Sequence, residues 1–174
     1  MQLRFTTKFD AVDDLLELDH RGRTRARFSL NAAPVTAFEG GTAPLARRID
    51  ALARMAAAGY PVGLTVAPIM PVEGWREHYG ALLDDVAAAL APVAGVDLTI
   101  ELITHRFTPN SKSVLTDWYP ATRLEMDEEV RTLKRTKFGS QKYVYPRDVM
   151  TELRGFFEEG IADRLPSARI LYWT

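Results

Sequence analysis

Between residues 24 and 103 the pattern of apolar positions predicts three strands separated by two helices. The segment 24–31 alternates polar and apolar residues, whereas 62–67 and 96–103 are nearly continuous apolar runs typical of buried strands. Apolar residues recur every three to four positions in 45–58 and 75–90, which predicts helices. A strand–helix–strand–helix–strand order predicts an α/β fold with a parallel sheet and right-handed crossovers.

The flanking segments are more mixed. Their patterns predict further elements: a short helix at 10–18, a loop at 34–44, a helix at 109–119, a strand at 122–126, a hairpin at 131–145, a helix at 147–165 and a terminal strand at 168–173. The hairpin turn is expected at Gly139-Ser140. We therefore distinguish a part built of βα units, 1–106, from a C-terminal extension, 107–174, within one compact unit.

Composition and charge narrow the class of protein. The 174 residues are 47% hydrophobic and 26% charged, which excludes a disordered chain. Lys and Arg number 22 and Asp and Glu 23, so the formal charge is -1 and a generally basic nucleic-acid coat is excluded, although a local basic patch is not. Neither a signal peptide nor an apolar run of membrane-spanning length is present, so the cytoplasm is the expected compartment and no membrane partner is expected.

The sequence contains no cysteine. Disulfides, thiolate zinc sites, cysteine nucleophiles and cysteine-held iron–sulfur clusters are therefore excluded within these 174 residues. His20 and His78 have no partner pattern that would suggest metal ligation, so no metal site is expected.

Ligands of parallel sheets gather at the carboxyl ends of the strands, where two pairs of polar residues stand. Ser29 and Asn31 share one face of a strand end, and together they suit ribose or carboxylate oxygens; alternatively, Asn31 caps the following loop. His105 and Arg106 follow the third strand, where they suit an anion or proton transfer; the alternative is a histidine hydrogen-bonded to a loop.

The predicted hairpin carries a concentrated positive charge. Residues 131–142 hold five basic side chains and no acidic one, with aromatic residues interleaved: Arg131, Lys134, Arg135, Lys137, Lys142, Phe138, Tyr143 and Tyr145. Such a pattern suits phosphate contacts combined with stacking or wedging at a base step. The alternative is a solvated edge, neutralised by the acidic stretch 125–129 that precedes it.

Several strings, in order along essentially the whole chain, resemble spore photoproduct lyase, a radical S-adenosylmethionine (SAM) DNA-repair enzyme. The strings are FTTKFDAVDDLLELDHRGRTRARFSLN, AAAGYPVGLTVAPI with EGW just after it, THRFTPNSK, RLEMDEE, KFGSQKYVYP and ILYWT. The resemblance implies a partial (β/α)6 barrel, of which 1–106 would supply the later strands. It also implies cleavage of SAM by a [4Fe–4S] cluster and removal of a hydrogen atom from a thymine dimer, the spore photoproduct, which then splits into two thymines.

Members of that family are longer and carry upstream cysteines that this sequence lacks: a C-x-x-x-C-x-x-C loop for the cluster and a hydrogen-donor cysteine. The resemblance therefore implies an N-terminally incomplete chain that is inactive alone, with no catalytic residue of its own. A partner chain carrying the cysteine loop would be one way to complete it.

The resemblance also assigns residues. Ser29 and Asn31 match positions facing the ribose or methionine part of SAM, and Ala67 matches a backbone contact near the adenosine. The hairpin at 131–145 matches the element inserted at the lesion, where Lys142 and Tyr143 agree with the family. Lys137 replaces an expected arginine and Phe138 an expected tyrosine; both substitutions lose hydrogen-bonding capacity.

Three hypotheses follow for this chain. It is the C-terminal part of a radical lyase that needs the cysteine loop from elsewhere, a DNA-binding remnant that uses the basic hairpin, or a non-functional relic. An incomplete barrel leaves sheet edges unpaired, so self-association is expected of a relic.

Overall fold

The computed structural model describes residues 2–135, 139 and 141–174. Five parallel strands form one sheet in the order β1-β2-β3-β4-β7, and two antiparallel strands, β5 and β6, form a separate hairpin. The strands are β1 (Leu3–Thr7), β2 (Thr24–Leu30), β3 (Val62–Ile69), β4 (Leu98–Thr104), β5 (Thr132–Arg135), β6 (Gln141–Val144) and β7 (Arg169–Trp173). The helices are α1 (Ala33–Thr36), α2 (Leu45–Ala57), α3 (Trp75–Leu90), α4 (Pro109–Trp118) and α5 (Arg147–Arg164). The predicted α/β architecture with a parallel sheet and a C-terminal hairpin is confirmed.

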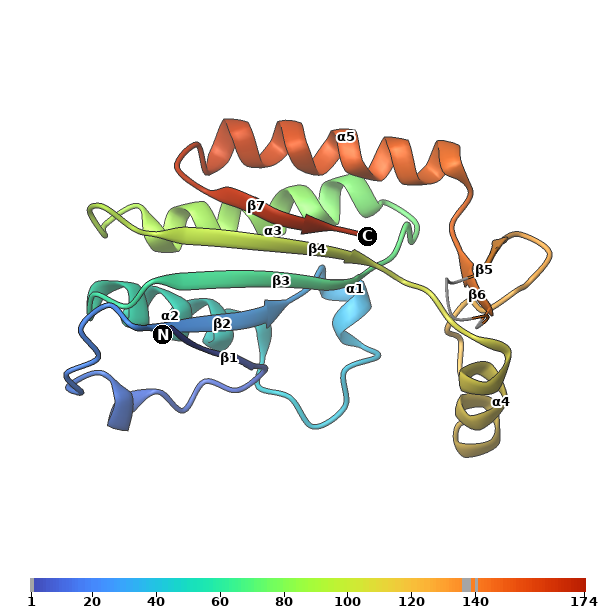
Figure 1. Cartoon of the computed structure of the whole chain (residues 1–174), viewed down its shortest axis with the longest axis horizontal. Helices are drawn as coiled ribbons and strands as arrows, with labels where there is room; N and C mark the ends of the chain where they lie inside the picture. The colour runs from blue at the N-terminus through green and yellow to red at the C-terminus, as the bar shows by residue number, and fades with distance from the viewer. Residues whose placement is uncertain (1, 136–138, 140) are drawn as a thin grey trace.

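The large helices α2, α3 and α5 cover one face of the sheet (Figure 1). The strand residues that point to this face are buried and apolar, as Phe28, Leu64 and Ile100 illustrate with 0 to 1% exposure. Leu52, Tyr79 and Phe157 meet them from the helices. This helix-covered face accounts for most of the hydrophobic stabilisation of the fold.

The opposite face of the sheet is polar and carries no helix among the described residues (Figure 1). Arg25 and Arg27 lie on it, and their side chains are only 5% and 4% exposed, because each crosses the neighbouring strands toward a carboxylate. Arg25 bonds Asp97 at 2.6 Å, and Arg27 pairs with Glu101. A helix-covered outer face and a polar inner face are what one side of an unclosed (β/α) barrel shows.

Gly63 makes room for this arrangement. A Cβ atom at that position would lie 3.0 Å from Nε of Arg27 and 3.1 Å from Oγ1 of Thr99. The absence of a side chain therefore lets the Arg27 side chain pass over β3 and reach β4.

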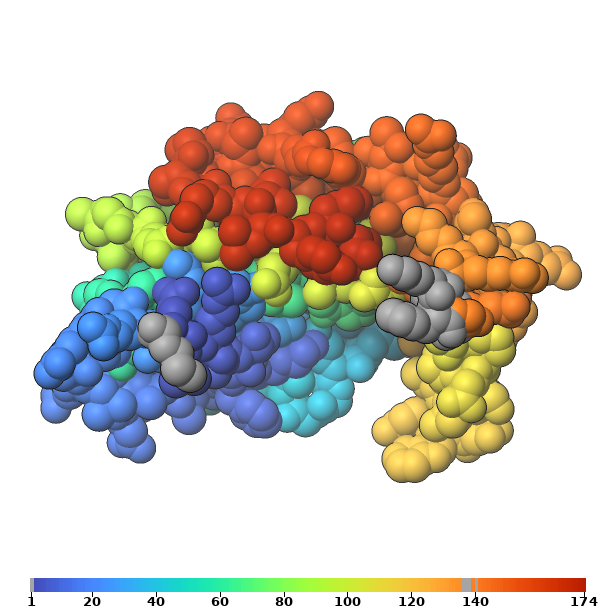
Figure 2. Space-filling view, viewed as in Figure 1, coloured from blue at the N-terminus to red at the C-terminus, as the bar shows by residue number. Residues whose placement is uncertain are grey.

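All five strands of the sheet point toward the end of the molecule that carries the hairpin and α4 (Figure 1). In the space-filling view the hairpin and α4 project from this end, beside the carboxyl ends of the strands (Figure 2). β7 pairs in parallel with β4, and α5 packs on α3, so the C-terminal extension contributes to the same sheet and core as the βα units.

Four expectations from the sequence are wrong. The segment 10–18 forms only a 3-10 turn at Asp13–Leu15, because nine residues gain too few intrahelical hydrogen bonds to hold an α-helix. The strand at 122–126 is absent: side-chain oxygens of Thr122, Glu125 and Asp127 bond nearby backbone N–H groups in place of a ladder. The loop at 34–44 begins inside α1, and β3 continues past Pro68 to Ile69 with a register shift.

The edge strand β1 was missed by sequence reasoning. Its residues mix charge, ring and hydroxyl, and at most half of them are shielded from solvent, so no clean alternation marks it. It pairs in parallel with β2 from Leu3 opposite Thr24 to Thr7 opposite Phe28. None of the described helices combines the length and apolarity needed to cross a bilayer.

Candidate functional site

The structure brings Ser29, Asn31 and Ala67 together at the carboxyl ends of β2 and β3. Ser29 lies opposite Thr65 in the parallel register, and Leu30 lies opposite Val66, so Asn31 and Ala67 follow side by side. Ser29 is 4% exposed, and Ala67 is half-buried. The carboxyl ends of the parallel strands lie together beside the hairpin and form the mouth of the partial barrel. A ligand bound at this mouth would touch both strands.

Asn31 is fully buried, and its side chain is bonded on both sides. Its Nδ2 donates to the carbonyl oxygen of Pro68 at 2.9 Å, and its Oδ1 accepts from the backbone N–H of Ala32 at 3.0 Å and from the Tyr79 hydroxyl at 3.2 Å. Tyr79 in turn accepts from the N–H of Met70 at 2.8 Å, and burial raises the pKa of its hydroxyl. The Asn31 side chain therefore ties the end of β2 to the end of β3 and to α3. Its bond to the N–H of Ala32 is the loop cap considered from the sequence.

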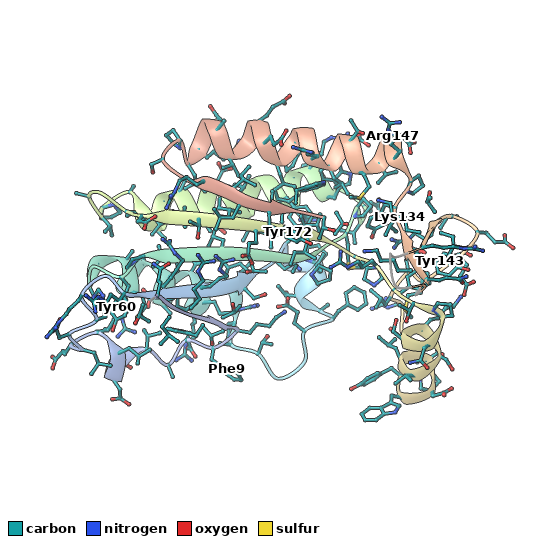
Figure 3. The ribbon with its side chains drawn as sticks, viewed as in Figure 1. Phe9, Tyr60, Lys134, Tyr143, Arg147 and Tyr172 are labelled. Atoms are coloured by element: carbon teal, nitrogen blue, oxygen red, sulfur yellow. The ribbon has the colours of Figure 1, made fainter. Side chains whose placement is uncertain are left out.

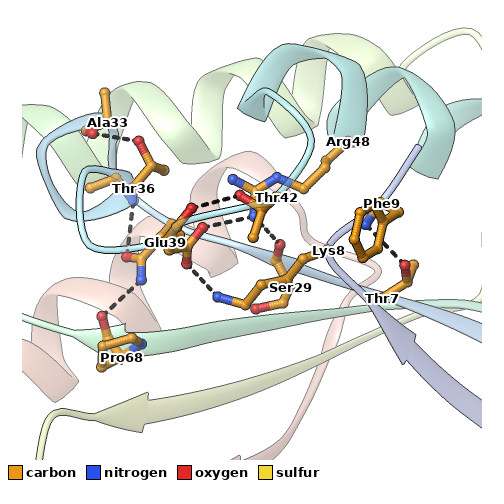
Figure 4. A network of polar contacts seen from close by, with 12 residues as sticks. Thr7, Lys8, Phe9, Ser29, Ala33, Thr36, Glu39, Thr42, Arg48 and Pro68 are labelled. Atoms are coloured by element: carbon orange, nitrogen blue, oxygen red, sulfur yellow. Dashed lines mark hydrogen bonds and ion pairs between the residues drawn. The ribbon is translucent and has the colours of Figure 1, made fainter. Parts of the chain in front are cut away.

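A buried ion network that sequence reasoning missed lies behind Ser29 (Figure 4). The Glu39 carboxylate meets Lys8 at 2.6 Å and Arg48 at 2.9 Å, and the same Arg48 nitrogen donates to the Ser29 carbonyl oxygen at 2.8 Å. The side chains of Arg48 and Glu39 are 1% and 4% exposed. Arg48 lies on α2, Glu39 lies in the loop after α1, and Lys8 directly follows β1. Because they lie in three different segments of the sequence, their spacing gave no signal that they would meet.

His105 follows β4 and is buried against Arg131, which lies one residue before β5. Arg131 Nη2 lies 3.1 Å from Nδ1 of His105, and Arg131 Nη1 donates to the His105 carbonyl oxygen at 3.1 Å. A guanidinium only donates, so Nδ1 accepts and the ring proton stands on Nε2. Burial, followed by the positive charge of Arg131, lowers the pKa of His105 from 6.5 to about 4. The imidazole is therefore neutral above that pH and is not a proton donor in the imidazolium form.

The lowered pKa of His105 predicts a pH-dependent stability. The unfolded chain binds a proton at this residue near pH 6.5 and the folded chain only near pH 4, so the stability is greatest above pH 6.5 and falls as the pH drops through that window. Between pH 7 and pH 4.5 the loss attributable to His105 is about 2 kcal/mol. Urea unfolding at both pH values measures it, and the His105→Asn variant, which does not titrate, isolates it from carboxylate effects. An equal loss in both proteins would contradict the assignment.

Arg106 is bonded to the C-terminal residue. Its Nη1 donates to the Thr174 hydroxyl at 2.8 Å, and the Thr104 hydroxyl bonds the Thr174 carbonyl oxygen at 2.9 Å. Arg106 therefore fixes the C-terminal residue beside β4.

The hairpin, on which Figure 3 labels Lys134 and Tyr143, stands at the mouth. Lys142 and Tyr143 lie on β6. Tyr143 stacks on Phe107 with ring centroids 5.2 Å apart, and the two residues exchange both backbone hydrogen bonds, at 2.7 and 3.2 Å. A hydrogen bond from the Tyr143 hydroxyl, followed by Lys112, lowers the pKa of Glu128. Lys137 and Phe138, the two positions that differ from the expected family residues, lie outside the described residues.

Lys134 and Lys142 lie directly opposite each other in the hairpin register. Like charges in this position destabilise an antiparallel pair, and an anion between them removes the penalty. The acidic stretch does not neutralise them among the described contacts: Glu125 pairs with Arg131, and Glu128 pairs with Lys112 at 3.3 Å. Arg131 itself is the exception to the predicted basic surface, since its side chain is fully buried.

The residues present fit the two expected cofactors unequally. Without cysteine, the chain has no thiolate for a [4Fe–4S] cluster, and the described residues hold no group of three or more His, Asp or Glu able to bind a metal ion. The Ser29 hydroxyl and the backbone at Ala67, by contrast, border the mouth and can serve a ligand that carries ribose and carboxylate oxygens.

Comparison with protein families and curated proteins identifies one family. The family model described as "Spore photoproduct lyase" matches residues 1–174. The chain is 48% identical over 174 residues to the spore photoproduct lyase of Bacillus subtilis (strain 168) and 42% identical over 174 residues to that of Geobacillus sp. (strain Y412MC61). In both comparisons it covers 99% of its own length and 51% of the relative, so it spans about half the length of these curated relatives.

Solved structures agree with the sequence comparisons. A spore photoproduct lyase variant with bound AdoMet and dinucleoside spore photoproduct superposes with a TM-score of 0.92 at 40% sequence identity. A spore photoproduct lyase complexed with dinucleoside spore photoproduct gives a TM-score of 0.91 at 41% identity. Each match covers 99% of this chain and 51% of the other.

Proposed function

Since the chain belongs to the spore photoproduct lyase family, we propose that residues 1–174 form the C-terminal half of an enzyme that repairs the spore photoproduct in DNA. The observation that carries the proposal is the placement of the basic hairpin at the same mouth as the ends of β2 and β3. One end of the sheet then presents both a cofactor-binding edge and a nucleic-acid-binding element.

Within this half, the ends of β2 and β3 are assigned to S-adenosylmethionine. The Ser29 hydroxyl faces its ribose or methionine oxygens, and the backbone at Ala67 meets its adenosine. Asn31 keeps the two strand ends in register through its bonds to Pro68 and Tyr79. In this family S-adenosylmethionine supplies the radical that removes a hydrogen atom from the lesion.

The hairpin is assigned to the damaged DNA. Lys134 and Lys142 meet the phosphate backbone, and the repulsion between them is relieved when a phosphate is bound. Tyr143, whose ring stacks on Phe107, acts at the lesion. Lys137 and Phe138 act there too, as the family resemblance implies. The cluster and the hydrogen-donor cysteine come from outside these 174 residues, either from an upstream segment of a longer polypeptide or from a separate chain.

The proposal is tested by reconstitution. The N-terminal half of the Bacillus subtilis relative, carrying its cysteines, is combined with this chain anaerobically, with reductant, S-adenosylmethionine and DNA containing the spore photoproduct. We expect 5′-deoxyadenosine and repaired thymines from the mixture and neither from this chain alone. A direct fusion of the two halves that binds its cluster and still gives no repair would contradict the proposal.

DNA binding by the chain alone separates the hairpin assignment from catalysis. We expect Lys142→Ala to weaken binding to duplex DNA at low salt and to reduce the slope of log K against log salt by about 1, because one phosphate contact is lost. Arg154→Ala, an exposed change on α5 that breaks only an ion pair with Glu158, is the control and should leave the slope unchanged. An unchanged slope in Lys142→Ala would remove this residue from the interface.

A further inference from the structure

The two ends of the hairpin and the end of β4 meet at one buried guanidinium. Arg131 precedes β5 by one residue, and Tyr145 follows β6 by one residue. His105 follows β4 by one residue. The Arg131 side chain is completely buried among these three elements.

All three nitrogens of the Arg131 guanidinium are bonded. Nε donates to the Glu125 carboxylate at 2.8 Å, and Nη2 also reaches that carboxylate. Nη1 and Nη2 bond the carbonyl oxygen and Nδ1 of His105, each at 3.1 Å. One planar group thus joins the segment before the hairpin to the strand that ends at the mouth.

The faces of the guanidinium are used as well. Its central carbon lies 3.5 Å from the ring centroid of Tyr145 and 5.7 Å from that of Phe107. Phe107 is the residue that pairs with Tyr143 of β6 through the backbone. Burial raises the pKa of Tyr145 to about 12, so this ring is neutral under ordinary conditions. A lysine cannot replace these contacts, because an ammonium lacks both the fork and the flat face.

We infer that Arg131 is a positioning residue, which fixes the pose of the hairpin relative to the strand ends and thereby sets recognition of the lesion. The inference rests on the proposed function of the hairpin. Arg131 therefore differs in role from the exposed hairpin cations. Arg131 acts through the backbone pair of Phe107 and Tyr143 and does not touch phosphate. His105 serves as the acceptor that orients the guanidinium.

One variant and a matched control test the inference in the full chain. Arg131→Lys keeps the charge and removes the fork. Arg76→Lys is the control, because Arg76 also joins a carboxylate, Glu152, and an aromatic ring, Trp75, but lies on α3 and is half-exposed. Amide hydrogen exchange reports the hairpin, and affinities for duplex DNA with and without the spore photoproduct report recognition.

We expect Arg131→Lys to raise exchange at the Tyr143 and Phe107 amides at least tenfold while the amides of β2 and β3 keep their protection. The preference for lesion-containing over undamaged duplex should fall about tenfold, with the salt dependence of binding to undamaged duplex unchanged. Arg76→Lys should change none of these. Unchanged exchange at Tyr143 would overturn the inference, and so would a retained lesion preference despite faster exchange.

His105 provides a rescue test. Asparagine places an amide oxygen near the position of Nδ1, so His105→Asn should keep slow exchange at Tyr143 and the lesion preference, whereas His105→Leu should lose both. Equal behaviour of the two variants would overturn the orienting role. If the wild-type chain shows no lesion preference, the proposed function of the hairpin fails. The exchange data on Arg131→Lys and on the two His105 variants still decide whether Arg131 holds the hairpin to the end of β4.

Discussion

Glu39→Ala is expected to destabilise the fold by about 3 to 5 kcal/mol, because it leaves Arg48 buried without its counter-charge. The Arg48 side chain is 1% exposed, its Nε has no hydrogen-bond partner among the described residues, and its bonds to Glu39 and Ser29 are both made by Nη1. Without Glu39, that nitrogen would retain only the Ser29 carbonyl oxygen. Urea unfolding at pH 7, followed by circular dichroism, measures the loss.

Two further variants show whether the cost comes from the uncompensated charge. Asp50→Ala removes the exposed partner of Arg54, 4.0 Å away, and should cost less than about 1 kcal/mol. The double replacement Glu39→Leu with Arg48→Met removes both charges and should recover most of the stability lost in Glu39→Ala. A loss in Glu39→Ala no larger than that in Asp50→Ala would mean that the network is solvated in solution.

The network also has a consequence for function. Arg48 donates to the carbonyl oxygen of Ser29, so Glu39 helps to hold the end of β2, where the proposed function places S-adenosylmethionine. Sequence reasoning located Ser29 from the strand end and the family resemblance. It did not find Glu39, because this residue lies in a loop rich in glycine and proline whose path depends on α1 and α2.

The regular elements were predictable because burial on one or both faces leaves a period in the sequence. The helix at 75–90 follows directly from such a pattern, and the structure has it. The hairpin was predicted instead from its Gly139-Ser140 turn, since β5 is exposed along its length and leaves no burial period. β1 was not predictable in this way, since an edge strand with exposed Leu3 buries too little to leave a period. The failure at 122–126 has the opposite origin, because local side-chain bonds overrode an acceptable strand pattern.

The site was predictable only in part, for a similar reason. Strand ends mark where ligands gather, which singled out Ser29 and Asn31, whereas Ala67 was assigned only by the family resemblance. The structure brings the three residues together, and their role in binding stays a prediction. Charge in the sequence, however, does not reveal whether a side chain is exposed. Arg131 counted as one of five hairpin cations, yet it lies wholly within the protein and pairs with the acidic stretch that was expected to neutralise the patch.

Phe157→Ala tests how the C-terminal extension is joined to the rest and is expected to cost about 3 to 5 kcal/mol. Phe157 lies on α5 with no exposed surface, and its ring meets Tyr79 of α3 edge-on at a centroid distance of 5.1 Å. The two helices are close here, since a Cβ atom on Gly160 would lie 3.0 Å from Leu83. Removing the ring leaves a cavity that neither helix can collapse around without moving the other. Urea unfolding measures the loss.

The distribution of the effect is as informative as its size. If β7 and α5 belong to one cooperative unit with the βα part, Phe157→Ala will lower hydrogen-exchange protection in β2 and β3 as much as in α5. Phe156→Ala is the matched control: its half-buried ring packs on Trp75 at 5.0 Å, and its removal should cost about 1 to 2 kcal/mol. Protection lost in α5 and β7 alone would instead make 107–174 a separately folding part. Because β7 pairs with β4 in the same sheet as β2 and β3, the first outcome would mean that the strand ends at Ser29 and Ala67 belong to one cooperative unit with α5 and β7.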